Sequence, residues 1–297
     1  MNQAKFLFVV LLLITAFSSV ACSETGFADS SQSSFINSNK PDIVFELGII
    51  GAMDIETAHI KEKMDVFSKS TIGGRIFYEG SVEGVSVVVV TCGIGKVNAA
   101  MTTQILISLY NVKSVIMTGV AGGLGPNLKY GDLVIAEDVV QHDYTRIYDD
   151  SMEPGRIKVM KKGKGSNVKS FPCDKKLQRQ LLSAAESIDF SGRTPLSGDD
   201  PTLWSGRIVS GDQFIGSSKM HQWLIEHFDP LAVDMETAAV GHVCLSFHIP
   251  FAAIRGISDL SSSTSVVHYH VNKGRGALHA QQVVLSLLYK RANSISP

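Results

Sequence analysis

The stretch Phe251-Ala-Ala-Ile-Arg-Gly-Ile-Ser-Asp259 joins an apolar, strand-like run to a carboxylate at its end. The same arrangement occurs twice more. Glu56 follows the run Leu47-Gly-Ile-Ile-Gly51, and Glu236 follows the run at residues 231–233. In α/β proteins the ends of the strands carry the chemistry. Three acids at three strand ends therefore indicate a site that makes and breaks a bond to a sugar.

Short apolar runs recur along the chain and alternate with patterns of helical period. The strand-like runs lie at residues 47–51, 87–92, 114–118, 132–136, 207–209, 231–233 and 251–257. The helical patterns lie at residues 97–109, 174–188, 236–247 and 273–291. This alternation predicts a single α/β domain over residues 42–297, with a central, mixed and mostly parallel twisted sheet flanked by helices. Residues 141–172 and 190–206 are less regular.

The amino-terminal residues have the pattern of a processing signal. Lys5 precedes an apolar segment at residues 6–17, which is too short to span a bilayer. Cys22 follows directly on a small-residue cleavage pattern. The pattern predicts a signal peptide over residues 1–21 and lipidation of Cys22 at the new amino terminus. A plain export signal with a chance cysteine is the alternative.

Residues 22–41 are rich in Ser and Asn and predict a flexible tether. A tether has a purpose between a lipid anchor and a folded domain. We therefore expect an exported, membrane-anchored lipoprotein that faces the periplasm or the cell exterior. A soluble periplasmic or secreted protein is the alternative.

Composition limits the possible partners. The chain has 27 basic and 28 acidic residues, so no overall field favours nucleic acid. The four cysteines form no CxxC pair, and we predict neither a metal site nor another cofactor. Residues 156–169 contain many lysines, which indicates a solvated basic loop. A patch for anionic polymers or lipid headgroups is the alternative.

Six motifs stand in an order that resembles a known family. They are Gly48-Ile-Ile-Gly-Ala-Met-Asp-Ile-Glu56, Gly93-Ile-Gly-Lys-Val97, Thr118-Gly-Val-Ala-Gly-Gly123, Ser210-Gly-Asp-Gln-Phe-Ile215, Asp234-Met-Glu236 and Arg255-Gly-Ile-Ser-Asp259. Each motif alone is weak, but the ordered set is specific. Over about residues 46–292 the chain resembles the 5′-methylthioadenosine/S-adenosylhomocysteine nucleosidases of the nucleoside phosphorylase superfamily.

The resemblance implies hydrolysis of an N-glycosidic bond with release of adenine. The leaving base needs a proton, which the resemblance assigns to Asp259 acting on adenine N7, with Ser258 orienting its carboxyl group. Glu56 is then the base that activates the attacking water. Arg255 helps to hold that water.

The resemblance also assigns the substrate contacts. Glu236 accepts hydrogen bonds from the ribose hydroxyls, and the Met235 thioether packs on the ring. Phe214 stacks on adenine, and the backbone of Ile215 reads the edge of the base. The sugar side is lined by Val120, Ala121 and Gly122, and Ile94 is a further substrate-binding residue. Family members often have Ser where Val120 stands, which affects one water or ribose contact.

Three other functions remain open on the sequence. Phosphorolysis is disfavoured because Glu56 occupies the place where an anion would bind. A nucleosidase acting on futalosine or aminodeoxyfutalosine would use the same three acids. A surface-exposed binding protein that retains the fold would fit the export signal. The resemblance further implies a small-molecule nucleoside substrate and a homodimer.

Overall fold

The structure is a computed structural model that describes residues 44–161, 163–190 and 200–295. The predicted signal peptide, Cys22 and the predicted tether lie outside these residues. Within the described ranges, no helix combines the length and apolar character needed to cross a membrane.

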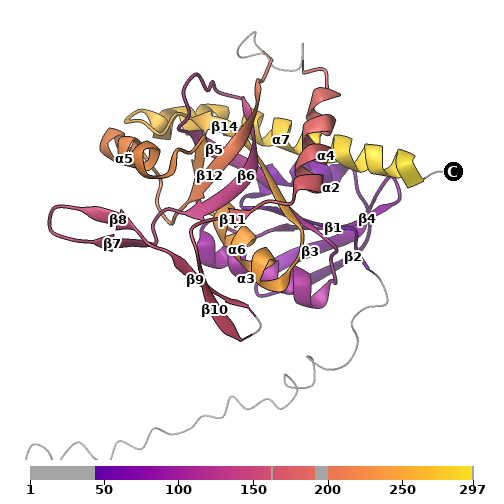
Figure 1. The fold of residues 1–297 in the computed structure, drawn as a ribbon. Helices are drawn as coiled ribbons and strands as arrows, with labels where there is room; N and C mark the ends of the chain where they lie inside the picture. Colours follow the sequence, from indigo (N-terminus) through magenta and orange to yellow (C-terminus); the bar gives the residue numbers. More distant parts are fainter. Residues whose placement is uncertain (1–43, 162, 191–199, 296–297) are drawn as a thin grey trace, which may run out of the picture. The chain divides into compact units, whose positions relative to one another are not determined.

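A mixed sheet of ten strands forms the centre of the folded unit (Figure 1). Its strands are β1 (Leu47–Gly51), β2 (Asp65–Ile72), β3 (Arg75–Val82), β4 (Val85–Thr91), β5 (Val115–Gly123), β6 (Leu133–Gln141), β11 (Phe171–Pro172), β12 (Leu203–Ser210), β13 (Ala232–Asp234) and β14 (Phe251–Asp259). The order along the sheet is β11-β6-β12-β13-β5-β1-β4-β3-β2. The prediction of an α/β domain with a mixed sheet is confirmed, and each predicted strand-like run falls on a strand.

Helices cover both faces of this sheet. They are η1 (Asp54–Glu56, a 3-10 helix), α2 (Ala58–Glu62), α3 (Lys96–Leu109), α4 (Lys175–Glu186), α5 (Ser218–Phe228), α6 (Thr237–Phe247) and α7 (Ser265–Ile295). Helices α3 and α6 bury apolar residues in one hydrophobic cluster, whereas α4 and α7 bury theirs in another. In β4, Val88 and Val90 join the first cluster and Val87 and Val89 the second. Such a strand is buried on both sides, which explains its unbroken run of valines.

Part of the sheet closes on itself. Strand β14 pairs with β5 along one edge and with β6 along the other, while β12 and β13 complete the connection between β6 and β5. The five strands form a closed barrel, which leaves none of them with a free edge. The register places both Val233 of the short, antiparallel β13 and Asp259 of the parallel β14 opposite Gly122 of β5, so the ends of these three strands lie side by side.

Helix α7 packs directly on strand β14 through two glycines. A Cβ atom built on Gly256 would overlap the backbone of Gly276, and one built on Gly276 would lie only 3.1 Å from the backbone of Gly256, so the two backbones are in close contact. This contact fixes α7 against the strand that carries Arg255 and Asp259.

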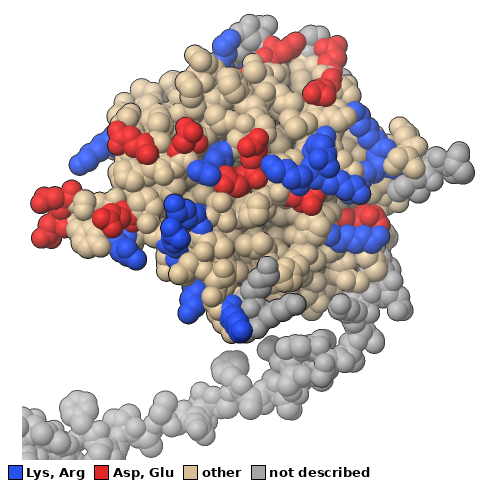
Figure 2. All heavy atoms as spheres, viewed as in Figure 1, with Lys and Arg blue, Asp and Glu red and all other residues tan. Residues whose placement is uncertain are grey.

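The segment that the sequence analysis described as irregular contains two antiparallel hairpins, β7 (Thr145–Ile147) with β8 (Met152–Pro154) and β9 (Ile157–Lys161) with β10 (Lys164–Val168). In the second hairpin Val159 packs into the core, whereas Lys158 is exposed. Figure 2 shows basic side chains along this hairpin and acidic ones at the tip of the first. The basic loop thus has one face that holds it to the domain and one face in solvent.

Candidate active site

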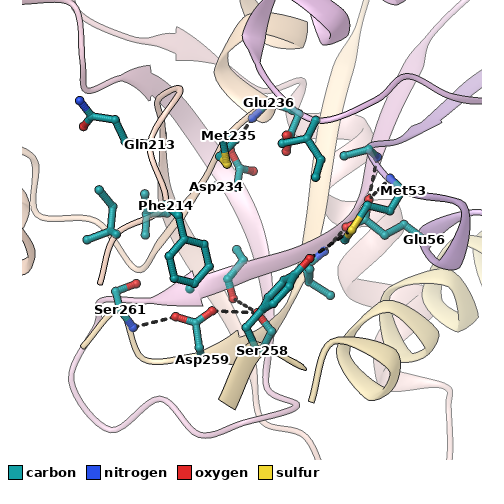
Figure 3. A pocket seen from close by; sticks show the side chains of 18 residues that line it. Met53, Glu56, Gln213, Phe214, Asp234, Met235, Glu236, Ser258, Asp259 and Ser261 are labelled. Carbon is teal, nitrogen blue, oxygen red and sulfur yellow. Dashed lines mark hydrogen bonds between the residues drawn. The ribbon is translucent and has the colours of Figure 1, made fainter. Parts of the chain in front are cut away.

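A cavity of about 230 Å³ opens at the carboxyl ends of β5, β13 and β14 (Figure 3). All of the predicted catalytic and substrate-binding residues except Arg255 line it. They are Glu56, Ile94, Val120, Ala121, Gly122, Phe214, Ile215, Met235, Glu236, Ser258 and Asp259. The cavity therefore brings together residues that the sequence spreads over more than half of the chain.

The Glu56 carboxylate is buried in the wall of the cavity. Its Oε2 accepts hydrogen bonds from the backbone N–H groups of Ala52 at 2.6 Å and Met53 at 2.9 Å, and its Oε1 accepts one from Val120 at 2.8 Å. Burial raises the pKa of this carboxyl group above its ordinary value, against the opposing effects of Arg255 and the three N–H donors. A carboxylate with a raised pKa is a stronger base than an exposed one.

Glu236 stands at the amino-terminal end of α6. Its Oε1 accepts a hydrogen bond from the backbone N–H of Gly95 at 2.8 Å, and its Oε2 lies 3.5 Å from Arg255 Nη2. Burial raises the pKa of Glu236 to about 8, with Arg255 opposing the shift and Asp234 adding to it. The contact with Gly95 connects this acid to the loop that carries Ile94.

Arg255 lies behind the cavity wall and is fully buried. It is surrounded by three carboxylates, with Nε 2.8 Å from Asp234 Oδ2 and Nη1 3.8 Å from Glu56 Oε1, in addition to its contact with Glu236. Its Nη2 also donates to Thr237 Oγ1 at 2.8 Å. A direct contact between Arg255 and the attacking water stays a prediction. The observed role of this cation is to balance the buried acids.

Asp259 occupies the opposite end of the cavity from Glu56 (Figure 3). Its Oδ2 accepts a hydrogen bond from Ser258 Oγ at 3.0 Å, and its Oδ1 accepts one from the backbone N–H of Ser261 at 2.9 Å. The Ser258 hydroxyl also lies 3.2 Å from the carbonyl oxygen of Ala121. The carboxyl group is thus held at both oxygens while it faces the cavity.

Aromatic side chains form the open side of the cavity. Phe214 is 47% exposed and meets Tyr269 edge to face, with ring centroids 5.8 Å apart. The Tyr269 hydroxyl donates to Met53 Sδ at 3.1 Å. An exposed aromatic face at the mouth of a cavity is suited to stacking against a flat ring.

Seven of the residues that line the cavity are absent from the predicted site: Ala52, Met53, Gln213, Val233, Asp234, Ser261 and Tyr269. Asp234 was quoted only as part of a motif, although it is the closest ionic partner of Arg255. Ser261 and Gln213 were not considered as site residues. Ser261 could have been predicted as a site residue, because it is a polar residue two positions after Asp259. Within the described ranges, no group of three or more His, Cys, Asp or Glu side chains is arranged to hold a metal ion.

Comparison with known proteins agrees with this fold. A family model described as the phosphorylase superfamily matches residues 46–288. The chain belongs to this superfamily and, within it, to the family of 5′-methylthioadenosine/S-adenosylhomocysteine nucleosidases. The resemblance noted on the motifs is confirmed.

Two nucleosidases of this name illustrate the similarity. The one from Staphylococcus haemolyticus is 33% identical over 243 residues, covering 82% of this chain and 98% of the relative. The one from Anoxybacillus flavithermus is 35% identical over 240 residues, covering 80% and 95%. The similarity thus extends over almost the whole length of each relative.

Solved structures show the same relationship. The nucleosidase of Neisseria meningitidis in complex with methylthio-immucillin-A is 30% identical, with a TM-score of 0.70, and the match covers 82% of this chain and 98% of that one. The futalosine hydrolase of Helicobacter pylori is 27% identical, with a TM-score of 0.69 and coverage of 83% and 98%. The fold is therefore shared by nucleosidases with different named substrates.

Proposed function

We propose that the protein hydrolyses the N-glycosidic bond of 5′-methylthioadenosine and S-adenosylhomocysteine and releases adenine. Support comes from its family, whose members carry that name, and from a cavity that combines three buried acids with an exposed aromatic ring. The acids are separated along the cavity, so each can act on a different part of a nucleoside. Asp259 serves as the proton donor to the base, and Glu236 holds the ribose.

The environment of Glu56 is the observation that favours hydrolysis over phosphorolysis. Its carboxylate accepts hydrogen bonds from three backbone N–H groups, which would otherwise suit an incoming anion. Among the described residues that line the cavity there is no Lys, Arg or His. A phosphate ion would therefore meet a carboxylate and no facing cation, whereas water can bind to Glu56 and be deprotonated by it.

The decisive assay measures release of adenine from purified protein with and without inorganic phosphate. We expect equal rates in both conditions and a free reducing sugar as the second product. Glu56→Gln should abolish turnover, whereas Asp54→Asn should not, because Asp54 is an exposed acid on the same short helix. Strict dependence on phosphate, with a sugar phosphate as product, would reject hydrolysis.

A futalosine-type nucleoside is a second candidate substrate, favoured by the similarity to the Helicobacter pylori futalosine hydrolase. The same three acids would serve this reaction, because the bond broken is again between a purine and a ribose. Comparing kcat/KM for the two kinds of nucleoside ranks the substrates. A binding protein without catalytic activity would release no base from either.

We also propose a homodimer. Ile94, in the loop before α3, is 51% exposed, and Val97 and Met101, one turn apart near the start of α3, are 75% and 41% exposed. Ile94 also lines the cavity, so a second copy on this face would lie at its open side. Light scattering should give twice the mass of one chain, and Val97→Asp should shift the protein towards the monomer. An active monomer at assay concentration would contradict the proposal.

Finally, we propose that the protein is exported and anchored through a lipidated Cys22. The support is the sequence pattern alone: a short apolar segment, a small-residue cleavage pattern and a polar stretch before the folded unit. Such an anchor would place the cavity outside the cytoplasmic membrane.

A further inference from the structure

The Ser261 hydroxyl is a polar group in the cavity wall that the mechanism does not use. The residue is 1% exposed, and its Oγ has no hydrogen-bond partner among the described residues. It lines the cavity beside Asp259. A buried hydroxyl without a hydrogen bond costs free energy. We therefore expect the Ser261 hydroxyl to form a hydrogen bond with a bound ligand.

The backbone holds this hydroxyl in place. Ser261 has a φ of 50°, in the left-handed region that residues other than glycine rarely adopt. Its N–H donates to Asp259 Oδ1 at 2.9 Å, and its carbonyl oxygen accepts from His221 Nδ1 of α5 at 3.2 Å. A Cβ atom on Gly122 would overlap Ser261 Oγ, so the glycine provides the space that the hydroxyl occupies. Both backbone groups are thus bonded while the side chain stays free.

The neighbours of Ser261 define which part of a bound purine it would meet. Asp259 Oδ2 faces Ser258, whereas Asp259 Oδ1 faces Ser261. The carbonyl oxygen of the next residue, Ser262, lies near Gly216, which directly follows Ile215. Ser261 therefore stands between the acid and the loop that is proposed to read the edge of the base.

A purine with N7 at Asp259 and its pyrimidine edge at Ile215 must place its 6-substituent between the two, because C6 lies between N7 and N1 on the perimeter of the ring. We propose that Ser261 Oγ hydrogen-bonds the 6-substituent of the base. This inference rests on the proposed function. Because a hydroxyl both donates and accepts, it suits a 6-oxo group as well as a 6-amino group. Ser261 would then select for purines that have a 6-substituent, and it would accept both 6-amino and 6-oxo purines.

The test measures equilibrium binding of three free bases to the full mature chain: adenine, hypoxanthine, and purine, which lacks a 6-substituent. Ser261→Ala keeps the backbone N–H bond to Asp259 and removes only the hydroxyl. We expect it to weaken adenine and hypoxanthine binding by about 3- to 10-fold, the value of one hydrogen bond, and to leave purine binding unchanged. Ser263→Ala, at an exposed position in the same loop, is the matched control and should change none of the three.

An equal loss for all three bases would overturn the inference, because the hydroxyl would then act on Asp259 or on N7. Unchanged binding of all three would overturn it as well. Circular dichroism and a thermal melt establish that the variant is folded. Failure of the proposed function would look different: the wild-type protein would release no adenine from nucleosides, whatever the pattern of base binding.

Discussion

Arg255 Nε and Asp234 Oδ2 lie 2.8 Å apart in a region closed to solvent. Asp234 Oδ1 also accepts hydrogen bonds from Ser210 Oγ at 2.5 Å and from the backbone N–H of Glu236 at 3.1 Å. The pair therefore connects β14 to the turn between β13 and α6, where Glu236 is located. It links the strand that ends in Asp259 to the acid proposed to bind ribose.

Removing this cation should destabilise the fold. Arg255→Met leaves the Asp234 carboxylate buried without its counter-charge, and breaking a buried pair in this way costs about 3–5 kcal/mol. Denaturant titration of the variant measures the change in the free energy of unfolding. Arg255→Lys is the matched control, since it keeps the charge but loses the planar fork, and its loss should be smaller. A stability of Arg255→Met equal to that of the wild type would contradict this account.

Replacing the proposed acid should impair catalysis and leave the fold intact. Asp259→Asn keeps the size of the side chain but removes the proton donor to the base, and we expect kcat to fall by about 10²–10⁴-fold. Single-turnover release of adenine measures the chemical step directly. Near-normal turnover in this variant would assign protonation of the base to another group.

Glu236 should make stability depend on pH. Its pKa is about 8 in the fold, because burial dominates, against an ordinary value of 4.5. Since the folded value lies above the unfolded one, the contribution to stability is complete below pH 4.5 and is lost as the pH rises through about 8. We expect the free energy of unfolding to fall between about pH 5 and about pH 9, by on the order of 1–4 kcal/mol from this group. In Glu236→Gln the fall should be smaller, and an identical pH profile would exclude the assigned shift.

The proposed anchor gives a prediction about location. Cys22→Ala should move the protein from the membrane fraction to the soluble fraction and leave hydrolysis unchanged, because the substitution lies far from the cavity residues in sequence. Several acyl chains together hold a protein firmly, whereas one holds it only marginally. Intact-mass measurement of the mature wild-type chain checks the modification itself. An unmodified amino terminus would leave plain export as the explanation.

The sequence was sufficient to predict that Glu56, Glu236 and Asp259 line one site, because each acid follows a strand-like run and α/β proteins place their chemistry at the ends of strands. It was not sufficient to predict the barrel. Closure depends on β14 pairing with β6 as well as with β5, and no local pattern encodes a second, antiparallel partner.

The roles of Asp234 and Ser261 in the site were likewise not predictable from the sequence. Asp234 follows an apolar strand just as the other acids do, but its importance comes from Arg255, which belongs to a strand that is not its neighbour in the sheet. The free hydroxyl of Ser261 depends on a left-handed backbone and on the space above Gly122, and both appear only in three dimensions.

The contact between Gly256 and Gly276 also restricts how the cavity can open. Two backbones meet there with no side chain between them, so α7 cannot slide or roll across β14 without a collision. Tyr269, at the mouth of the cavity, lies about two helical turns before Gly276. The glycine pair therefore fixes the position of α7 on β14, and any movement of the Tyr269 ring has to come from its own side chain or from the turns of α7 before Gly276.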